Sequence, residues 1–163
     1  MSRKDLRIRV AGKEDVPLVF EFIKKLARYE RLSHEVTVTE EILRENLFEG
    51  RRVAEAILAE HQQIAVGFAL YFHNFSTFIG QAGIFIEDLY VDELCRGRGF
   101  GRALFLYIAR LARERGCGRV EWSVLDWNRP AIQFYESLGA KPQSGWTTYR
   151  LAGEALQKLS EAP

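Results

Sequence analysis

The sequence predicts an α/β protein of the α+β kind, with a mixed and mostly antiparallel central sheet flanked by helices. Three apolar segments follow one another in the middle of the chain, at Val53–Ala59, Ile64–Phe75 and Ile84–Val91. Three successive strands exclude a sheet in which strands and helices alternate regularly. The segments on either side carry apolar residues at helical spacing, so helices are expected to cover the sheet.

The N-terminal part is expected to contain one strand and two helices. Apolar residues alternate with arginines over Leu6–Val10, which is the period of a strand. From Lys13 the apolar spacing becomes helical, and Pro17 lies in the first turn, where proline is tolerated. Thr37, at capping-box spacing from an acidic residue, or Thr39 is expected to begin a short second helix.

Turns and glycines divide the remainder of the chain. The polar turn Glu60–Gln63 joins the first two central strands into an antiparallel hairpin. After the glycine-rich segment Asp92–Gly101, a helix is expected over Ala103–Ala112 and a strand over Arg119–Leu125. Pro130 begins a further helix.

The C-terminal part is predicted to end the fold with a strand at Trp146–Leu151 and a helical turn at Ala155–Leu159. The sequence shows no repeat, low-complexity stretch or linker. Residues 1–163 are therefore expected to form a single domain.

Composition excludes several classes of protein. Lys and Arg number 23 and Asp and Glu number 22, and a net charge of +1 argues against a dedicated nucleic-acid binder. The longest apolar run, Ile64–Phe72, is far shorter than the ~20 residues of a membrane span. No secretory signal is visible, so a cytoplasmic protein without a membrane partner is expected. Cys95 and Cys117 form no CxxC pair, which argues against a disulfide scaffold and a metal site.

The strongest local signal is Arg96-Gly97-Arg98-Gly99-Phe100-Gly101-Arg102, between an apolar strand and an amphipathic helix. Glycines let backbone amides turn inward, and the N-terminus of the following helix adds partial positive charge. These features suit a phosphate or pyrophosphate. A flexible, solvated turn is the equally weighted alternative on this loop alone.

Other nucleotide-binding and catalytic motifs fail. The third glycine of GxGxxG is replaced by Arg102, and the sole Gly-Lys pair, Gly12-Lys13, is followed by an acidic residue instead of Ser or Thr. The sequence has neither GxSxG nor HExxH. The scattered histidines, which are expected to be solvated, are His34, His61 and His73.

The loop Arg96–Gly101 resembles the (Gln/Arg)-x-x-Gly-x-(Gly/Ala) signature of the GNAT superfamily of N-acetyltransferases. The order of elements is also similar, as is Asn128–Ala131 followed by Phe134-Tyr135 and Gly139. The resemblance implies a GNAT-like fold, with a splayed strand pair that receives coenzyme A, and an acetyl-CoA-dependent N-acetyltransferase.

A narrower resemblance concerns the diamine (spermidine/spermine) acetyltransferase family. Leu26–Glu30 and Ile86–Val91 are similar to segments of that family, and Leu125–Asn128 and Tyr71–Phe78 resemble its thialysine-acetylating branch. The implied acceptor is a primary amine of a small molecule, either a thialysine- or lysine-like amino acid or a di- or polyamine.

The resemblance also implies where acetyl-CoA binds. Leu89 and Val91 would bond its pantetheine through their backbones, and a nearby amide would polarise the thioester carbonyl. Arg96–Arg102 would hold the pyrophosphate, and Asn128 would hold the cofactor through its side-chain amide. The cofactor-binding residues expected are Leu89, Tyr90, Val91, Arg96, Gly97, Arg98, Gly99, Phe100, Gly101, Arg102, Asn128, Pro130, Ala131 and Tyr135.

The implied reaction is direct transfer in a ternary complex, without use of Cys95 or Cys117. A primary amine has a pKa near ~10.4 and must lose a proton before attack, so Glu87 is expected to act as general base through a water. Tyr135 would return a proton to the departing thiolate. Alternation along the strand predicts that the neighbouring Asp88 points to the opposite face. The alternatives are an exposed strand residue for Glu87 and a core aromatic for Tyr135.

The expected acceptor site is acidic but lacks two features of the spermidine branch. Ser76-Thr77-Phe78 stands where that branch has an acidic residue before its tryptophan, and the loop Lys141–Gly145 is shorter and has no carboxylate. An amino-acid-like amine therefore becomes more plausible than a polycation. The substrate-binding residues expected are Tyr29, Glu30, Glu87, Glu121, Trp122, Ser123 and Trp146.

Other functions stay open at this point. A sensor that binds acyl-CoA without catalysis would not need Tyr135, and a protein lysine or N-terminal acetyltransferase would need an open groove. The seven arginines from Arg96 to Arg119 are interpreted as cofactor contacts plus a solvated face, not as an RNA site. The resemblance implies a homodimer, which the aromatic segment Tyr71–Phe78 supports weakly.

Overall fold

The computed structural model describes residues 5–162 of the chain. The chain divides after Leu125 into a larger N-terminal unit and a smaller C-terminal unit. None of the helices described is long and apolar enough to cross a membrane.

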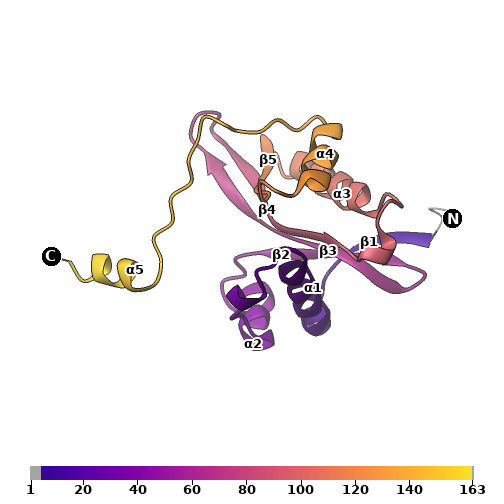
Figure 1. The fold of residues 1–163 in the computed structure, drawn as a ribbon, viewed down its shortest axis with the longest axis horizontal. Helices are drawn as coiled ribbons and strands as arrows, with labels where there is room; N and C mark the ends of the chain where they lie inside the picture. The colour runs from indigo at the N-terminus through magenta and orange to yellow at the C-terminus, as the bar shows by residue number, and fades with distance from the viewer. Residues whose placement is uncertain (1–4, 163) are drawn as a thin grey trace. The chain divides into compact units, whose positions relative to one another are not determined.

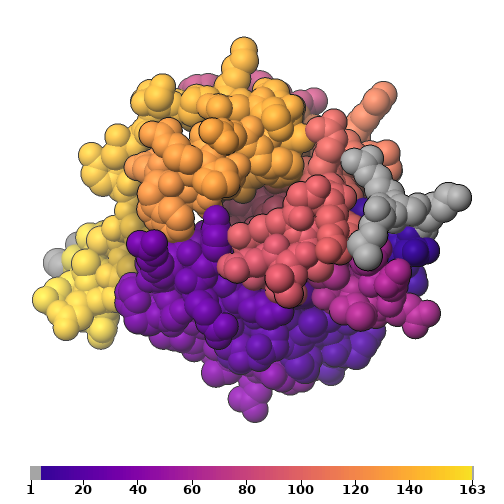
Figure 2. Space-filling model, turned by 45° about the vertical axis from the view of Figure 1, so that its right-hand side comes forward, coloured from indigo at the N-terminus to yellow at the C-terminus, as the bar shows by residue number. Residues whose placement is uncertain are grey.

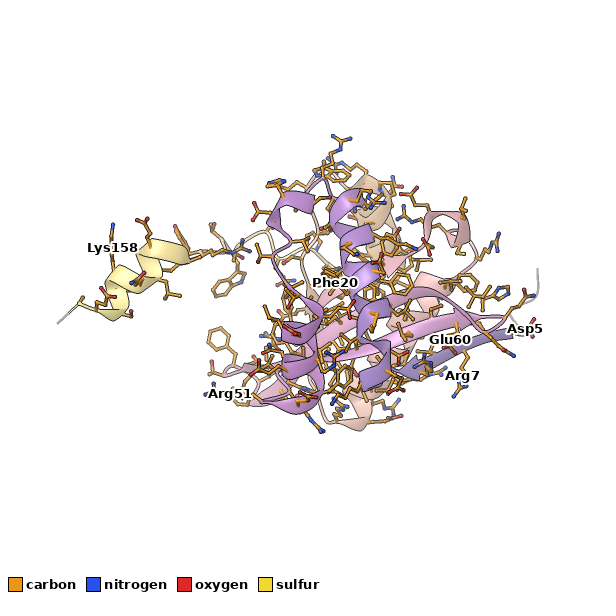
Figure 3. All side chains as sticks on the ribbon, turned by 90° about the horizontal axis from the view of Figure 1, so that it is seen from below. Asp5, Arg7, Phe20, Arg51, Glu60 and Lys158 are labelled. Atoms are coloured by element: carbon orange, nitrogen blue, oxygen red, sulfur yellow. The ribbon has the colours of Figure 1, made fainter. Side chains whose placement is uncertain are left out.

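The N-terminal unit is built on a five-stranded sheet whose spatial order follows the sequence. All neighbouring strands are antiparallel except the last pair, which is parallel. The mixed, mostly antiparallel sheet predicted from the sequence is therefore confirmed. Figure 3 shows Glu60 beside Arg7, its register partner on the first strand. The strands are β1 (Leu6–Val10), β2 (Glu55–His61), β3 (Ile64–Ser76), β4 (Gln81–Val91) and β5 (Arg119–Trp122).

Helices cover both faces of this sheet, with α1 and α2 on one side and α3 on the other (Figure 1). Thr39, one of the two caps predicted from the sequence, begins α2 by accepting a hydrogen bond from the Ile42 amide at 3.3 Å. The helices are α1 (Val16–Tyr29), α2 (Glu40–Arg44) and α3 (Phe100–Glu114), with 3-10 turns η2 (Lys13–Asp15), η3 (Ser33–Glu35) and η5 (Glu93–Cys95) and a π-helical turn η4 (Glu45–Glu49).

The core on the α1 side is apolar and close-packed. The rings of Phe22 and Phe68 stack with their centroids 5.5 Å apart, and Tyr90 lies 6.2 Å from Phe22. Alternation along the strands sends the intervening apolar residues to the α3 side. The buried residues of this core are Ala11, Val16, Val19, Phe22, Leu43, Leu47, Ala56, Leu58, Phe68, Leu70 and Tyr90.

A β-bulge interrupts the pairing of β3 with β4. Tyr71 pairs with Ile86 and Leu70 pairs with Asp88, so Glu87 is an extra residue in β4. Residues paired across two strands share a face of the sheet. Ile86 therefore lies on the α3 side with Tyr71, whereas Asp88 lies on the α1 side with Leu70. After the bulge, the side chains of β4 therefore lie on the opposite faces from those that regular alternation would give them.

The pairing of β4 with β5 ends where the bulge begins. The parallel register runs from Gly83 opposite Arg119 to Ile86 opposite Trp122, and β5 ends there, three residues short of the predicted Leu125. Beyond that point β4 continues to Val91 and pairs with β3 alone among the strands described. The backbone edge of β4 on the β5 side thus opens after Ile86, which fits the splayed strand pair expected from the sequence.

The C-terminal unit contains two helices, α4 (Arg129–Ser137) and α5 (Gly153–Ser160). The strand predicted at Trp146–Leu151 is wrong, because this segment has no regular structure and is exposed. Its β-forming residues need a neighbouring strand to satisfy their backbone groups, and residues 126–162 include no other strand. The unit's two helices match the predicted positions.

Candidate active site

The loop predicted to hold an anion has the required backbone conformation. Gly97 and Gly99 have φ of 74° and 84°, in the left-handed region that favours glycine. Gly99 is the N-cap of α3, which begins at Phe100. The first amides of α3 have no partner within the helix, so the loop ends at a helix terminus suited to a phosphate.

The end of β4 supplies backbone groups beside this loop. Leu89 pairs with Ala69 and Val91 with Gly67, so both belong to the strand edge that no longer pairs with β5. The Val91 carbonyl already accepts a hydrogen bond from Arg96 Nε at 3.0 Å. The side chain of Tyr90 packs into the core on the α1 side.

Three carboxylates gather where the bulge meets the end of α1. Glu30 directly follows α1, Glu87 is the exposed bulge residue, and Asp88 is half-buried. Burial, and then the charges of Glu87 and Glu30, raise the pKa of Asp88 to about 7. Burial also raises the pKa of Glu30. This region therefore attracts a cation and holds a carboxyl group that titrates near neutrality.

The bulge removes the basis for the expectation that Glu87 and Asp88 point to opposite faces, and the face on which Glu87 lies stays a prediction. Strict alternation holds only in a regular strand, and the extra residue at Glu87 breaks it. Asp88 lies on the face of Leu70, where Glu30 can affect its charge. The sequence shows the adjacent acidic pair Glu87-Asp88, but no local pattern in it predicts the bulge that places Asp88 on the α1 side.

The predicted acceptor residues at β5 divide between the two faces of the sheet. Glu121 accepts a hydrogen bond from Asn74 Nδ2 at 3.0 Å and pairs with Arg119 at 2.8 Å. Trp122 points the other way, with its ring 4.9 Å from that of Phe105 on α3. Ser123 lies beyond the strand and is exposed. These neighbours do not line one wall together.

In the C-terminal unit, Asn128 serves as the N-cap of α4, because its Oδ1 accepts the Ala131 amide at 3.3 Å. Pro130 occupies the first turn, as predicted. Tyr135 lies on α4 with its ring 5.5 Å from that of Phe134. Trp146 is exposed in the irregular segment that follows.

Among residues 5–162, no group of three or more His, Cys, Asp or Glu side chains is arranged so that it could hold a metal ion. Of the seven arginines, Arg115 pairs with Glu55 and Arg119 with Glu121. The guanidinium of Arg96 packs on Tyr29. Three of the seven thus have partners within the protein.

Comparison with known sequences places these features in a family. Residues 20–140 match the Acetyltransferase (GNAT) family, and this match includes β4, the loop and Tyr135. The chain belongs to the GNAT family. It is accordingly an acyltransferase, and the superfamily resemblance in the sequence is confirmed.

The relatives include enzymes that act on small amines. A thialysine N-epsilon-acetyltransferase of Mus musculus is 37% identical over 94% of this chain and 96% of the relative. An L-ornithine N5-acetyltransferase of Arabidopsis thaliana is 32% identical over 95% of this chain and 88% of the relative. Among solved structures, an integron cassette protein of V. cholerae superimposes with a TM-score of 0.81, at 28% identity, over 97% of this chain and 99% of that structure. The GNAT protein thus resembles acetyltransferases of amine-bearing amino acids over nearly its whole length.

Proposed function

We propose that this GNAT protein transfers acetyl from acetyl-CoA to the primary amine of an amino-acid-like acceptor such as thialysine, lysine or ornithine. The observation that carries the proposal is the bulge at Glu87. It gathers Glu30, Glu87 and Asp88 beside the strand edge that opens after Ile86. The acidic cluster would bind the ammonium group of the acceptor, and the adjacent open edge of β4 would bind the thioester of acetyl-CoA. The names of the thialysine and ornithine relatives support this choice of acceptor.

Acetyl-CoA fits the open edge of β4 and the loop that follows it. Leu89 and Val91 would bond the pantetheine, and the amides around Gly97 and Gly99 at the start of α3 would hold the pyrophosphate. Asn128, Pro130 and Ala131 at the start of α4 would complete the cofactor site. The positive φ values of the two glycines support this role for the loop.

The proposed chemistry is direct attack on the thioester. Glu87, through a water, takes a proton from the ammonium group, and the neutral nitrogen attacks the acetyl carbonyl carbon. A backbone amide of β4 stabilises the negative charge on the oxygen. The carbon–sulfur bond breaks as the amide forms, and Tyr135 gives its proton to the thiolate. Asp88 and Glu30 attract the ammonium before reaction.

An amino-acid acceptor is favoured over a polycation because the anionic groups lie in one place. Ser76, at the end of β3, is buried, and Phe78 beyond it is 90% exposed, so this hairpin offers no carboxylate where the spermidine branch has one. The loop 141–145 has none either. A polycation needs several spaced anions, whereas one amine beside a carboxylate needs one acidic cluster.

The test is release of the CoA thiol from acetyl-CoA with a panel of thialysine, lysine, ornithine, putrescine, spermidine and spermine. Turnover is expected on an amino acid and is expected to fall 10²–10⁴-fold in Tyr135→Phe, as for the loss of a general acid. Glu87→Gln should lower turnover most at neutral pH and less at high pH, where the amine is already neutral. Binding of acetyl-CoA without turnover on any amine would favour a sensor or a protein acetyltransferase.

Two further expectations accompany the proposal. A homodimer is expected, and light scattering of the purified protein would measure its mass against 18.8 kDa for one chain. A cytoplasmic location is expected as well, which fractionation of the source cells would check.

A further inference from the structure

The side chain of Arg96 folds back against the end of α1, although the residue is exposed to solvent. Its guanidinium carbon lies 4.3 Å from the centroid of the Tyr29 ring and 5.4 Å from that of Tyr90. Its Nε donates to the Val91 carbonyl at 3.0 Å. A planar guanidinium that stacks on aromatic faces and bonds a backbone carbonyl is fixed in orientation. Arg96 thus joins the end of α1 to the end of β4.

A second contact ties the same helix to the same turn. Lys25 Nζ lies 3.0 and 3.1 Å from the two carboxylate oxygens of Asp92. The Asp92 amide in turn donates to the Val66 carbonyl of β3 at 2.9 Å. Lys25 and Tyr29 are one helical turn apart and lie on the same face of α1. The last turn of α1 therefore holds both ends of the turn 92–96, and Figure 2 shows this salmon-coloured region directly against the indigo surface of α1.

The end of α1 also carries an acceptor-side carboxylate. Glu30 follows Tyr29 directly, and its charge adds to the effects of burial and of Glu87 that raise the pKa of Asp88. A displacement of Tyr29 by the cofactor loop would therefore move Glu30 relative to Asp88. One short stretch of backbone connects the region proposed for the pyrophosphate with the region proposed for the amine.

We propose that Arg96 is a positioning residue that couples binding of CoA to binding of the amine, by docking the cofactor loop on Tyr29. This inference rests on the proposed function. The coupling is reciprocal, so a bound amine tightens CoA by the same factor by which CoA tightens the amine. The competing role for Arg96 is that of a charge that contacts the phosphates directly. Lysine would preserve such a charge, but it cannot reproduce the stacked guanidinium or the bond from Nε.

The first experiment measures, without any ligand, how much the stacking of Arg96 on Tyr29 contributes to stability. The free energy of unfolding is determined for Arg96→Lys, Tyr29→Leu and the double variant, with Tyr29→Phe as the variant that keeps the ring. The double variant is expected to lose less than the two single changes together, because each removes the same contact. Tyr29→Phe keeps the ring, so in that background Arg96→Lys should lower the free energy of unfolding by as much as it does in the parent chain. Additive losses would overturn the proposal.

The second experiment measures the coupling by calorimetry with CoA as the probe. The dissociation constant of CoA is determined alone and with a saturating amount of the amine that turns over fastest in the panel. In the parent chain the amine is expected to tighten CoA about tenfold. Arg96→Lys should reduce this factor to about one, whatever its affinity for CoA alone. Arg28→Gln, on the exposed neighbour of Tyr29, should keep the factor.

Each further outcome has a defined meaning. If Arg96→Lys weakens CoA equally with and without amine, Arg96 acts on the cofactor alone and the proposal is overturned. The same follows if the parent chain shows no coupling. If the parent chain binds no CoA, the proposed function fails. The unfolding free energies of the single and double variants then still decide whether Arg96 and Tyr29 are coupled.

Discussion

Replacing Asp88 with asparagine is expected to stabilise the protein above neutral pH. The carboxyl group is half-buried, and Glu87 and Glu30 add negative charge around it, so its pKa rises from 3.8 to about 7. Each pKa unit corresponds to about 1.36 kcal/mol of free energy. Ionising Asp88 in the folded protein therefore costs about 4 kcal/mol at most. Water around a half-buried group reduces this, and we expect a gain of about 1–2 kcal/mol at pH 8.

The stability gained by Asp88→Asn is expected to increase as the pH rises. A group whose pKa is raised in the folded state contributes stability below its unfolded pKa and loses that contribution as the pH rises through its folded pKa. The advantage of Asp88→Asn should therefore be absent near pH 4, grow between pH 4 and 7, and stay constant above pH 7. The exposed Glu93→Gln variant serves as the control for removing one negative charge.

The assay is urea unfolding at pH 4, 6 and 8, followed by fluorescence. The difference between variant and parent cancels the titration of all other groups. A gain of equal size at pH 4 and pH 8 would contradict the prediction, and so would a loss at pH 8. Either result would mean that burial and the neighbouring carboxylates do not raise the pKa of Asp88 in the folded protein.

Three further predictions concern stability and the loop. Arg115 makes a two-pronged ion pair with Glu55 and holds its pKa below the usual range, so Glu55→Gln should lower the free energy of unfolding by about 1 kcal/mol at pH 7 and by less at pH 3, measured by urea unfolding. Gly83→Ala should cost about 1–3 kcal/mol in the same assay, because a Cβ there meets Asn74 Oδ1, and adding Asn74→Ala should restore part of the loss. Gly99→Val should weaken CoA binding in calorimetry, because φ of 84° is unfavourable for a β-branched residue; unchanged affinity would remove this loop from the cofactor site.

Much of the fold follows from local pattern. The positions of α1, α3 and α4 and of the first four strands were predicted within a few residues, because amphipathic period and caps are properties of neighbouring residues. The glycines of the loop predict a backbone whose amides can turn inward, and the structure gives Gly97 and Gly99 positive φ values. Local pattern failed at Trp146–Leu151, where β-forming residues lack a partner strand in their own unit.

The sequence predicts which residue types form the candidate site, but not which way their side chains lie. The acidic pair Glu87-Asp88, the glycine loop and the acetyltransferase signature follow from the order of residues alone. That Asp88 shares a face with Leu70, where the charge of Glu30 acts on it, and that Arg96 stacks on Tyr29 are known only from the folded chain. A bulge depends on how two strands pair, and a stacking contact joins residues far apart in the chain. Neither follows from local periodicity, because both depend on packing between elements.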